Sequence, residues 1–126
     1  MSGKTKILIV EDEQSLREIY TEYLKASGYE IISAADGQEA LEKAKGIAGI
    51  DIILLDVMLP KIDGITVLKE LKADPKTKKI PVYLMTVLSL KDLEKKDTKS
   101  EADGYIIKDT MNPEQIKELI EKTLKK

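Results

Sequence analysis

Lys6–Asp12 (KILIVED) and Asp51–Asp56 (DIILLD) each run from an apolar strand pattern directly into acidic residues. Both runs are short, rich in β-branched side chains and apolar at consecutive positions, which is typical of central parallel strands covered by helices on both faces. If the two strands are neighbours, Glu11, Asp12 and Asp56 converge at the carboxyl edge of the sheet, where ligands bind in open α/β folds. Three like charges held close together repel one another, so the cluster predicts a bound cation.

Strand patterns and helical patterns alternate along the chain. The expected strands are Lys6–Val10, Glu30–Ala34, Asp51–Asp56, Pro81–Thr86 and Gly104–Lys108. Such alternation implies right-handed crossovers and a parallel sheet with helices on both faces. The sequence therefore predicts an α/β fold in a single domain that spans residues 1–126.

Several residues mark the expected ends of the helices. Gly28 is placed to end the first helix, Asp74 precedes a proline that stops the third, and Asn112 is a capping residue for the last. The fourth helix is weakly predicted, because Glu94–Glu101 has no apolar side chain to bury. A solvated helix end and a mobile or partner-ordered segment both remain open for this stretch.

Composition excludes several classes of protein. The net charge is −2 with both signs interleaved, so neither nucleic acid nor an anionic membrane is an expected partner. The chain has no cysteine and no histidine, which excludes disulfides, Ser-His-Asp catalysis and His-ligated zinc. No apolar stretch is long enough to span a bilayer, and no signal-peptide core precedes the acids after the first strand. We expect a cytoplasmic, stand-alone domain.

Five motifs in this order resemble the receiver domain of bacterial two-component response regulators, with the spacing of a single-domain chemotaxis receiver. They are Glu11-Asp12, Asp56–Pro60, Asp63-Gly64, Thr86 and Gly104–Lys108. The resemblance covers essentially the whole chain. It implies a flavodoxin-like, doubly wound fold with five helices and a five-stranded parallel sheet in the order 2-1-3-4-5.

The resemblance also implies a role for the acidic residues. Asp56 is the position that accepts a phosphoryl group from a sensor histidine kinase or a phosphotransfer protein. Glu11, Asp12 and the Asp56 carboxylate match the residues that bind Mg²⁺, together with the backbone carbonyl of Met58. A hard divalent cation with oxygen ligands suits this step, because it reduces the repulsion between an anionic acceptor and an anionic phosphoryl group.

Three further residues match the family pattern at the ends of the last two strands. Thr86 and Lys108 are expected to contact the phosphoryl group, as a hydroxyl donor and a point charge. Thr86 and Tyr105 match the positions that switch a protein-interaction surface, whose downstream target the sequence does not name. The chain is not expected to be an enzyme beyond accepting the phosphoryl group and losing it by hydrolysis.

The chain departs from the family pattern around this site. Asp109 follows Lys108 where the family has a proline joined by a cis peptide, so the bond here is either trans or strained. Val87 is bulkier than the usual alanine or glycine. Met58 and Leu88 stand two residues beyond the acceptor and the threonine, and neither can hold a water by hydrogen bonding. We therefore expect slow loading and slow hydrolysis.

Other interpretations compete with this one. Each residue has an ordinary structural role when taken singly; Glu11 and Asp12, for example, could cap the first helix. A haloacid-dehalogenase type phosphatase would need an acid where Met58 stands, and an FMN-binding flavodoxin-like domain would need a phosphate loop after the first strand. A pseudo-receiver, acting as a phosphorylation-independent interaction module, remains the main alternative.

Overall fold

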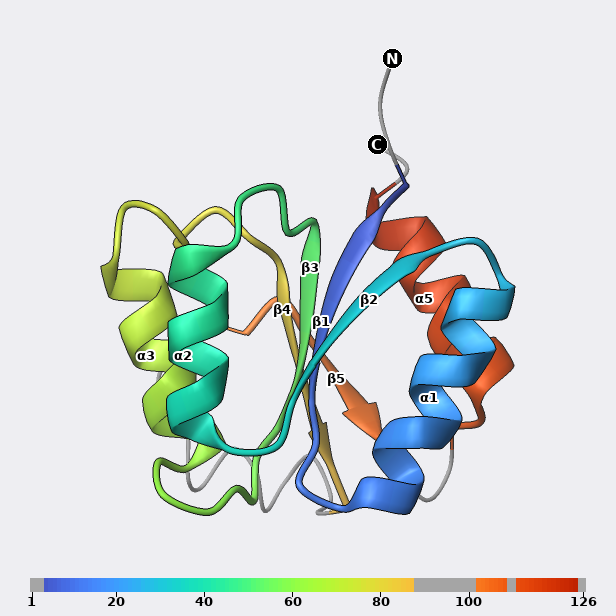
Figure 1. The fold of residues 1–126 in the computed structure, drawn as a ribbon, viewed down its shortest axis with the longest axis horizontal. Helices are drawn as coiled ribbons and strands as arrows, with labels where there is room; N and C mark the ends of the chain where they lie inside the picture. Colours follow the sequence, from blue (N-terminus) through green and yellow to red (C-terminus); the bar gives the residue numbers. More distant parts are fainter. Residues whose placement is uncertain (1–3, 88–101, 109–110, 125–126) are drawn as a thin grey trace.

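The computed structural model describes residues 4–87, 102–108 and 111–124. Strands and helices alternate from β1 to β4 as predicted, and β5 and α5 follow in the later ranges (Figure 1). The elements are β1 (Lys6–Val10), α1 (Gln14–Ala26), β2 (Glu30–Ala34), α2 (Gly37–Gly46), β3 (Ile52–Asp56), α3 (Gly64–Ala73), β4 (Val82–Thr86), β5 (Gly104–Ile107) and α5 (Pro113–Leu124). Within these ranges, no helix combines the length and the apolar character needed to cross a bilayer.

The five strands form one parallel sheet in the order β2-β1-β3-β4-β5. This confirms the predicted α/β class and the predicted strand order. β1 and β3 are neighbours, and Val10 lies opposite Leu55 in their register. The next residues, Glu11 directly after β1 and Asp56 at the end of β3, therefore lie side by side at the carboxyl edge of the sheet.

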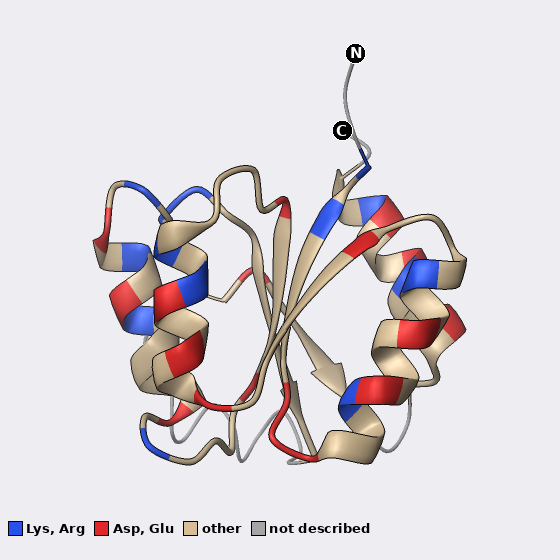
Figure 2. Cartoon of the chain, in the orientation of Figure 1, with Lys and Arg blue, Asp and Glu red and all other residues tan. Residues whose placement is uncertain are grey.

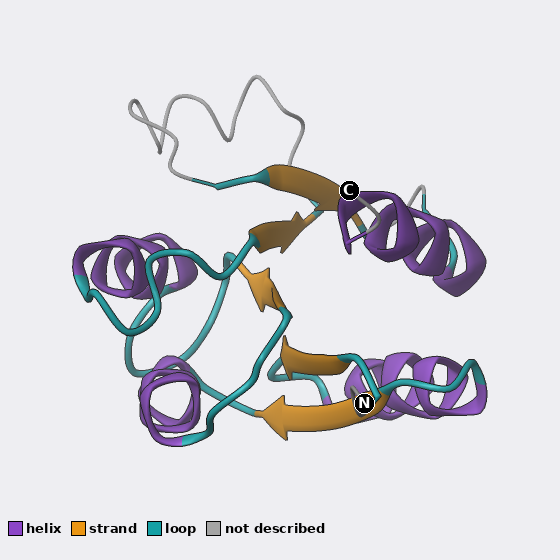
Figure 3. Cartoon of the chain, turned by 90° about the horizontal axis from the view of Figure 1, so that it is seen from above, coloured by secondary structure: helices purple, strands orange, loops and turns teal. Residues whose placement is uncertain are grey.

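Helices cover both faces of the sheet (Figure 3), and the side chains of its central strands are buried at consecutive positions, which explains why these strands are apolar throughout. The layer under α2 and α3 contains Leu8, Val10, Ile53, Leu55, Val82 and Leu84. The layer under α1 and α5 contains Ile7, Ile9, Ile52, Leu54, Met85 and Ile106. Each fully buried aliphatic side chain contributes about 1.5–3 kcal/mol of transfer free energy, so the two layers supply much of the stability that holds the edge in place.

The helix ends follow the signals in the sequence. Gly28 adopts a φ of +101° directly after the α1 cap, a backbone conformation that glycine reaches without strain. Asn112 and Gln115 bond reciprocally: the Asn112 side chain accepts from the Gln115 amide, and the Gln115 side chain accepts from the Asn112 amide, each at 2.9 Å. This capping box fixes the start of α5 just beyond the carboxyl edge.

A few predicted boundaries were wrong by one residue. β3 begins at Ile52 because the Asp51 carboxylate turns back to accept a hydrogen bond from the Lys6 amide at 2.8 Å. β4 begins at Val82 because Pro81 has no N–H for the ladder. β5 ends at Ile107, so Lys108 stands in the following turn. Four of the five predicted helices fall in the described ranges, and the segment predicted for the fourth lies outside them.

Gly64 sets how closely α3 approaches the end of β3. A Cβ at this position would come within 2.2 Å of the Asp56 carbonyl oxygen and 2.7 Å of the Val57 Cα. The Gly64 amide donates to the Val57 carbonyl at 2.9 Å, and Asp63 caps the helix by accepting from the Thr66 amide. Only glycine allows this packing of a helix start against the backbone that carries Asp56.

We predict that Gly64→Ala lowers the free energy of unfolding by about 1–3 kcal/mol, because the added methyl group must displace backbone rather than a flexible side chain. Urea unfolding monitored by circular dichroism measures the change. Gly46→Ala in α2 is the matched control, since a Cβ there meets nothing within 4 Å. The control should leave stability unchanged or raise it by up to about 1 kcal/mol. Equal effects of the two substitutions would contradict the proposed close packing.

Candidate functional site

The three acids predicted from the sequence do come together. Glu11, Asp12 and Asp56 each place a carboxylate oxygen within 4.8 Å of the others. Figure 2 shows the acidic loop between β1 and α1 at the carboxyl edge of the sheet. Glu11 and Asp56 are buried, with exposed fractions of 0% and 3%, whereas Asp12 is exposed. The cluster is therefore a half-closed site with two fixed carboxylates and one that faces solvent.

Lys108 supplies the positive charge at the centre of this cluster. Its Nζ lies 2.7 Å from Glu11 Oε1 and 3.1 Å from Asp56 Oδ2. The Lys108 amide donates to the Thr86 carbonyl at 2.8 Å, which anchors the residue to the end of β4. Lys108 was predicted to pair with a phosphoryl group on Asp56; its contact with Glu11 was not predicted.

Burial and the ion pairs of Lys108 act in opposite directions on the pKa values of Glu11 and Lys108. Burial and the neighbouring Asp56 charge raise the pKa of Glu11 from 4.5 to about 7, although the ion pair with Lys108 opposes the shift. Burial also disfavours the charged form of Lys108, but contacts with Glu11 and Asp56 outweigh it and raise the pKa of this amine. One cation is thus shared between two buried carboxylates, and negative charge remains in excess.

The donor set fits a hard divalent cation. Carboxylate oxygens are the ligands that Mg²⁺ and Ca²⁺ prefer, and three of them converge here. Glu11 Oε1 is fully buried and, among the described residues, accepts no hydrogen bond of good geometry despite its ion pair with Lys108. The Lys108 ammonium offsets part of the cost of burying this oxygen, and a divalent cation held by the cluster would offset more of it.

The two residues predicted to act as a switch lie close to the acids on the last strands. Thr86 ends β4 and is buried, and it pairs in register with Ile107 of β5. Tyr105 is half-buried on β5, pairs with Leu84 and packs on the layer under α2 and α3. Because side chains alternate along a strand, Thr86 and Tyr105 share one face of the sheet. Their switching role stays a prediction.

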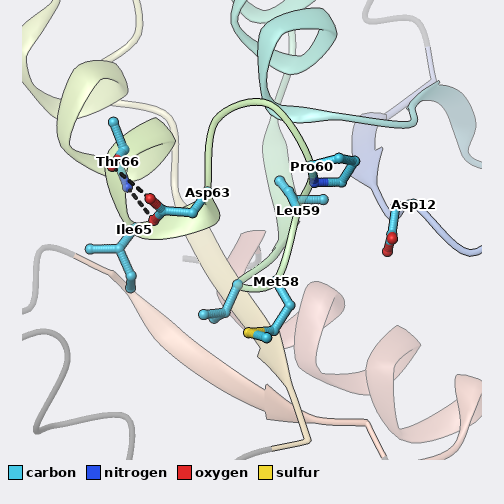
Figure 4. Close-up of a pocket in the computed structure, with 8 residues that line it drawn as sticks. Asp12, Met58, Leu59, Pro60, Asp63, Ile65 and Thr66 are labelled. Carbon is cyan, nitrogen blue, oxygen red and sulfur yellow. Dashed lines mark hydrogen bonds between the residues drawn. The ribbon is translucent and has the colours of Figure 1, made fainter.

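A groove opens beside the acceptor position along the loop that follows β3 (Figure 4). Its volume is about 720 Å³, and its lining includes Asp12, Met58, Leu59 and Ile65. The Met58 amide donates to Asp56 Oδ1 at 3.0 Å, which orients the carboxylate, while the Met58 side chain is 59% exposed. The groove beside Asp56 therefore combines apolar side chains, such as Met58, with the carboxylates of Asp12 and Asp63.

The same loop is held from the other side by the start of α2. A Cβ on Gly37 would come within 2.1 Å of the Ile62 carbonyl oxygen, so the two segments are in close backbone contact. Lys61, whose φ is +68°, reaches Asp36 with its Nζ at 3.4 Å. Asp36 in turn caps α2 by accepting from the Glu39 amide at 2.8 Å. The loop that carries Met58 is thus fixed between α2 and α3.

The acid pair lies directly before α1, but neither residue is the N-cap of that helix. Glu13 is the N-cap of α1 and makes no side-chain capping bond; Glu11 Oε2 accepts from the Glu13 amide at 3.2 Å. One residue in this region was not predicted: Arg17 donates from Nη1 to the Glu11 carbonyl at 2.7 Å. Its only sequence signal is that it is the sole arginine of the chain.

Comparison with known proteins identifies the family. The model of the family described as "Response regulator receiver domain" matches residues 7–121. The chain therefore belongs to the receiver domains of response regulators, as the sequence motifs predicted.

Individual relatives agree with this. The chain is 38% identical over 125 residues to "Probable transcriptional regulator ycf27" of Porphyridium aerugineum, a match that covers 98% of this chain and 49% of that protein. It is 35% identical over 102 residues to "Polar-differentiation response regulator DivK" of Brucella anthropi, with 81% and 82% covered. The chain spans about half the length of the first curated relatives that it matches.

Solved structures show the same fold. Chemotaxis protein CheY4 of Vibrio cholerae matches with a TM-score of 0.87 and 30% identity, covering 97% of this chain and 100% of that one. Response regulator TrrA of Thermotoga maritima, solved in complex with Mg²⁺-BeF, matches with a TM-score of 0.82 and 36% identity, covering 95% and 99%.

We predict that Asp56→Asn raises the free energy of unfolding of the metal-free protein by about 1 kcal/mol, the energy of one pKa unit. The substitution removes one of two buried carboxylates that share Lys108, and the amide can still accept from the Met58 N–H. Thermal and urea unfolding in the presence of a chelator measure it. Glu22→Gln on the exposed side of α1 is the control and should change stability by less than about 0.5 kcal/mol. A loss of stability in Asp56→Asn would show that the carboxylates do not repel one another in one site.

Proposed function

We propose that this domain accepts a phosphoryl group on Asp56 from a phosphohistidine of a sensor kinase or phosphotransfer protein, and that the modification switches a protein-interaction surface. The observation that carries the proposal is the buried Asp56 carboxylate, which contacts Lys108 and lies within 4.8 Å of the acid pair. Membership in the receiver family supports it. The chain itself has no histidine, so the phosphohistidine belongs to the donor.

In the proposed transfer, an Asp56 carboxylate oxygen attacks the phosphorus atom. A P–O bond forms, the P–N bond of the donor breaks, and the imidazole nitrogen keeps the electron pair of the broken bond. Lys108 holds a positive charge beside the acceptor, and the Met58 amide fixes the carboxylate so that it meets the donor in one orientation. Thr86 ends the neighbouring strand and would donate its hydroxyl group to an equatorial phosphoryl oxygen. Positioning and charge supply most of the catalysis in such transfers.

Mg²⁺ is the metal that we propose for the site. Glu11, Asp12 and Asp56 would hold it with their carboxylates, and the Met58 carbonyl would complete the protein ligands. When bound, Mg²⁺ supplies positive charge that offsets the repulsion between the phosphoryl group and the acids. The similarity to TrrA, which was solved with Mg²⁺-BeF, supports this choice.

The proposed activity is modification of the domain itself rather than turnover of a separate substrate. Phosphorylation would be read by a downstream protein through a surface coupled to Thr86 and Tyr105, which share one face of the sheet. Direct contact with nucleic acid or membrane is not part of the proposal, and a cytoplasmic location fits it. The pseudo-receiver alternative differs in one respect: it predicts the same fold with no phosphoryl adduct.

We predict that acetyl phosphate with Mg²⁺ adds one phosphoryl group to the protein, and that Asp56 is the only site. Intact-mass spectrometry should show a single adduct that disappears in Asp56→Asn and in the presence of a chelator. Asp51→Asn is the control, because Asp51 lies at the opposite end of β3 and should leave the adduct unchanged. An adduct that persists in Asp56→Asn would overturn the assignment, and no adduct on the wild type would favour the pseudo-receiver.

We also predict that the acyl-phosphate bond of phosphorylated Asp56 is hydrolysed slowly. An attacking water must be held in line with the acyl-phosphate bond, and the entrance offers Met58 and Val87, which are 59% and 60% exposed and cannot orient it by hydrogen bonding. Leu88, predicted to contribute to the same entrance, lies outside the described residues. The decay of the adduct after removal of the donor gives the half-life.

Met58→Asn tests this explanation because its amide can hold a water, whereas Met58→Leu keeps the entrance apolar. The asparagine variant should lose its phosphoryl group several-fold faster, and the leucine variant should match the wild type. Val87→Ala should speed loading. A half-life of seconds in the wild type, or identical decay in all variants, would show that the apolar entrance does not control hydrolysis.

A further inference from the structure

Arg17 is the only arginine among the 21 basic residues of the chain. It lies at the end of the first turn of α1, half-buried, and its Nη1 donates to the backbone carbonyl of Glu11 at 2.7 Å. Among the described residues the guanidinium forms no ion pair with a carboxylate, although α1 and the loop before it are rich in acids. Its contact is directed at the backbone of a predicted metal ligand.

The carbonyl that accepts this bond belongs to the peptide unit between Glu11 and Asp12. That unit is planar, so fixing its oxygen fixes the orientation of the whole plane and of the Cα atoms on both sides. The Glu11 amide, one unit earlier, is already tied to the Ala34 carbonyl at 3.0 Å. The Arg17 contact acts directly on the peptide unit that leads from Glu11 to Asp12, whereas the Glu13 amide contacts the Glu11 side chain.

Asp12 depends on this orientation more than its neighbours do. Glu11 is held through both carboxylate oxygens, by the Glu13 amide and by Lys108, and Asp56 is held by Lys108 and Met58. Asp12 is exposed, and in the described part of the chain no hydrogen bond holds its carboxylate. Its place in the cluster comes from the backbone.

We infer that Arg17 is a positioning residue for the metal site, which it serves by locking the peptide plane that joins the two acidic ligands on the β1–α1 loop. The inference rests on the proposed Mg²⁺ site. A guanidinium suits this positioning role better than an ammonium group, because its N–H groups are held in a rigid plane. The other 20 basic residues of the chain are lysines. Groups outside the ligand shell that orient ligands in this way commonly change metal affinity 10–100-fold when removed.

The direction in which Mg²⁺ affinity changes when Arg17 is replaced distinguishes a positioning role from a simple effect of its charge. A cation close to the acids repels a second cation, so removing the Arg17 charge should by electrostatics alone tighten Mg²⁺ binding. Loss of positioning has the opposite effect, because the Asp12 carboxylate no longer meets the other two. A weaker metal affinity in a variant that lacks the guanidinium therefore reports geometry.

The experiment is a calorimetric Mg²⁺ titration of the wild type, Arg17→Met and Lys25→Met. Lys25 lies on the same helix, is exposed and provides the same change of charge. We expect a dissociation constant about 10-fold higher for Arg17→Met and an unchanged or lower one for Lys25→Met. Arg17→Lys, whose amine can still donate one hydrogen bond, should fall between Arg17→Met and the wild type. Unchanged or tighter binding in Arg17→Met would overturn the inference.

A second measurement uses the unmodified protein and does not depend on any variant folding. Because the chain has one arginine, its guanidinium ¹⁵N signals belong to Arg17 without ambiguity. In the metal-free protein these signals should show restricted rotation, and they should shift with the same midpoint as Mg²⁺ binding. Freely rotating signals that ignore Mg²⁺ would overturn the inference. Failure of the wild type to bind Mg²⁺ would instead count against the proposed function, which keeps the two outcomes distinct.

Discussion

The register between β1 and β3 is the constraint on which the site depends. Val10 lies opposite Leu55, so the next residues, Glu11 and Asp56, emerge together from a sheet that is buried on both faces. A slip of one residue would turn every side chain of β1 to the other face and would separate the acids. The two apolar layers therefore do more than stabilise the fold, because they prevent the carboxylates from moving apart.

The carboxylates in turn impose a cost on the fold. Glu11 and Asp56 are buried and share the amine of Lys108, and burial raises the pKa of Glu11 to about 7. Burying two carboxylates beside one amine is unfavourable in the absence of a bound cation. The arrangement persists because many contacts of the surrounding backbone hold it in place. Gly64 lets α3 approach the Asp56 backbone, and Gly37 lets α2 approach the loop that follows. Close packing at these glycines holds the site in a geometry that the charges alone would oppose.

The two sides of the site are held by different means. On the β3 side, tight contacts between backbone segments fix the loop that carries Met58. On the β1 side, hydrogen bonds to the Ala34 carbonyl and from the Arg17 guanidinium hold the Glu11 backbone. Asp12 faces solvent. The exposed carboxylate, that of Asp12, is thus the one whose position rests on the fewest contacts. Because few contacts hold the β1–α1 loop, one side chain, that of Arg17, is enough to influence the position of Asp12.

Local patterns in the sequence determined the strands, the ends of the helices and the identity of the acids that meet at the edge. Apolar runs, capping residues such as Asn112 and the glycine after α1 act over a few residues, so they can be recognised without the fold. The family motifs predicted Asp56, Thr86 and Lys108 as site residues, and the structure brings Lys108 into contact with Asp56. Only the tertiary structure decided the contacts that join distant segments. The pairing of Lys108 with Glu11, the close approach of Gly37 to Ile62 and the bond from Arg17 to the Glu11 carbonyl depend on how the elements pack. The identity of a lysine, a glycine or an arginine does not indicate which distant residue it contacts. That partner is set by the packing of the elements, which no short stretch of sequence contains.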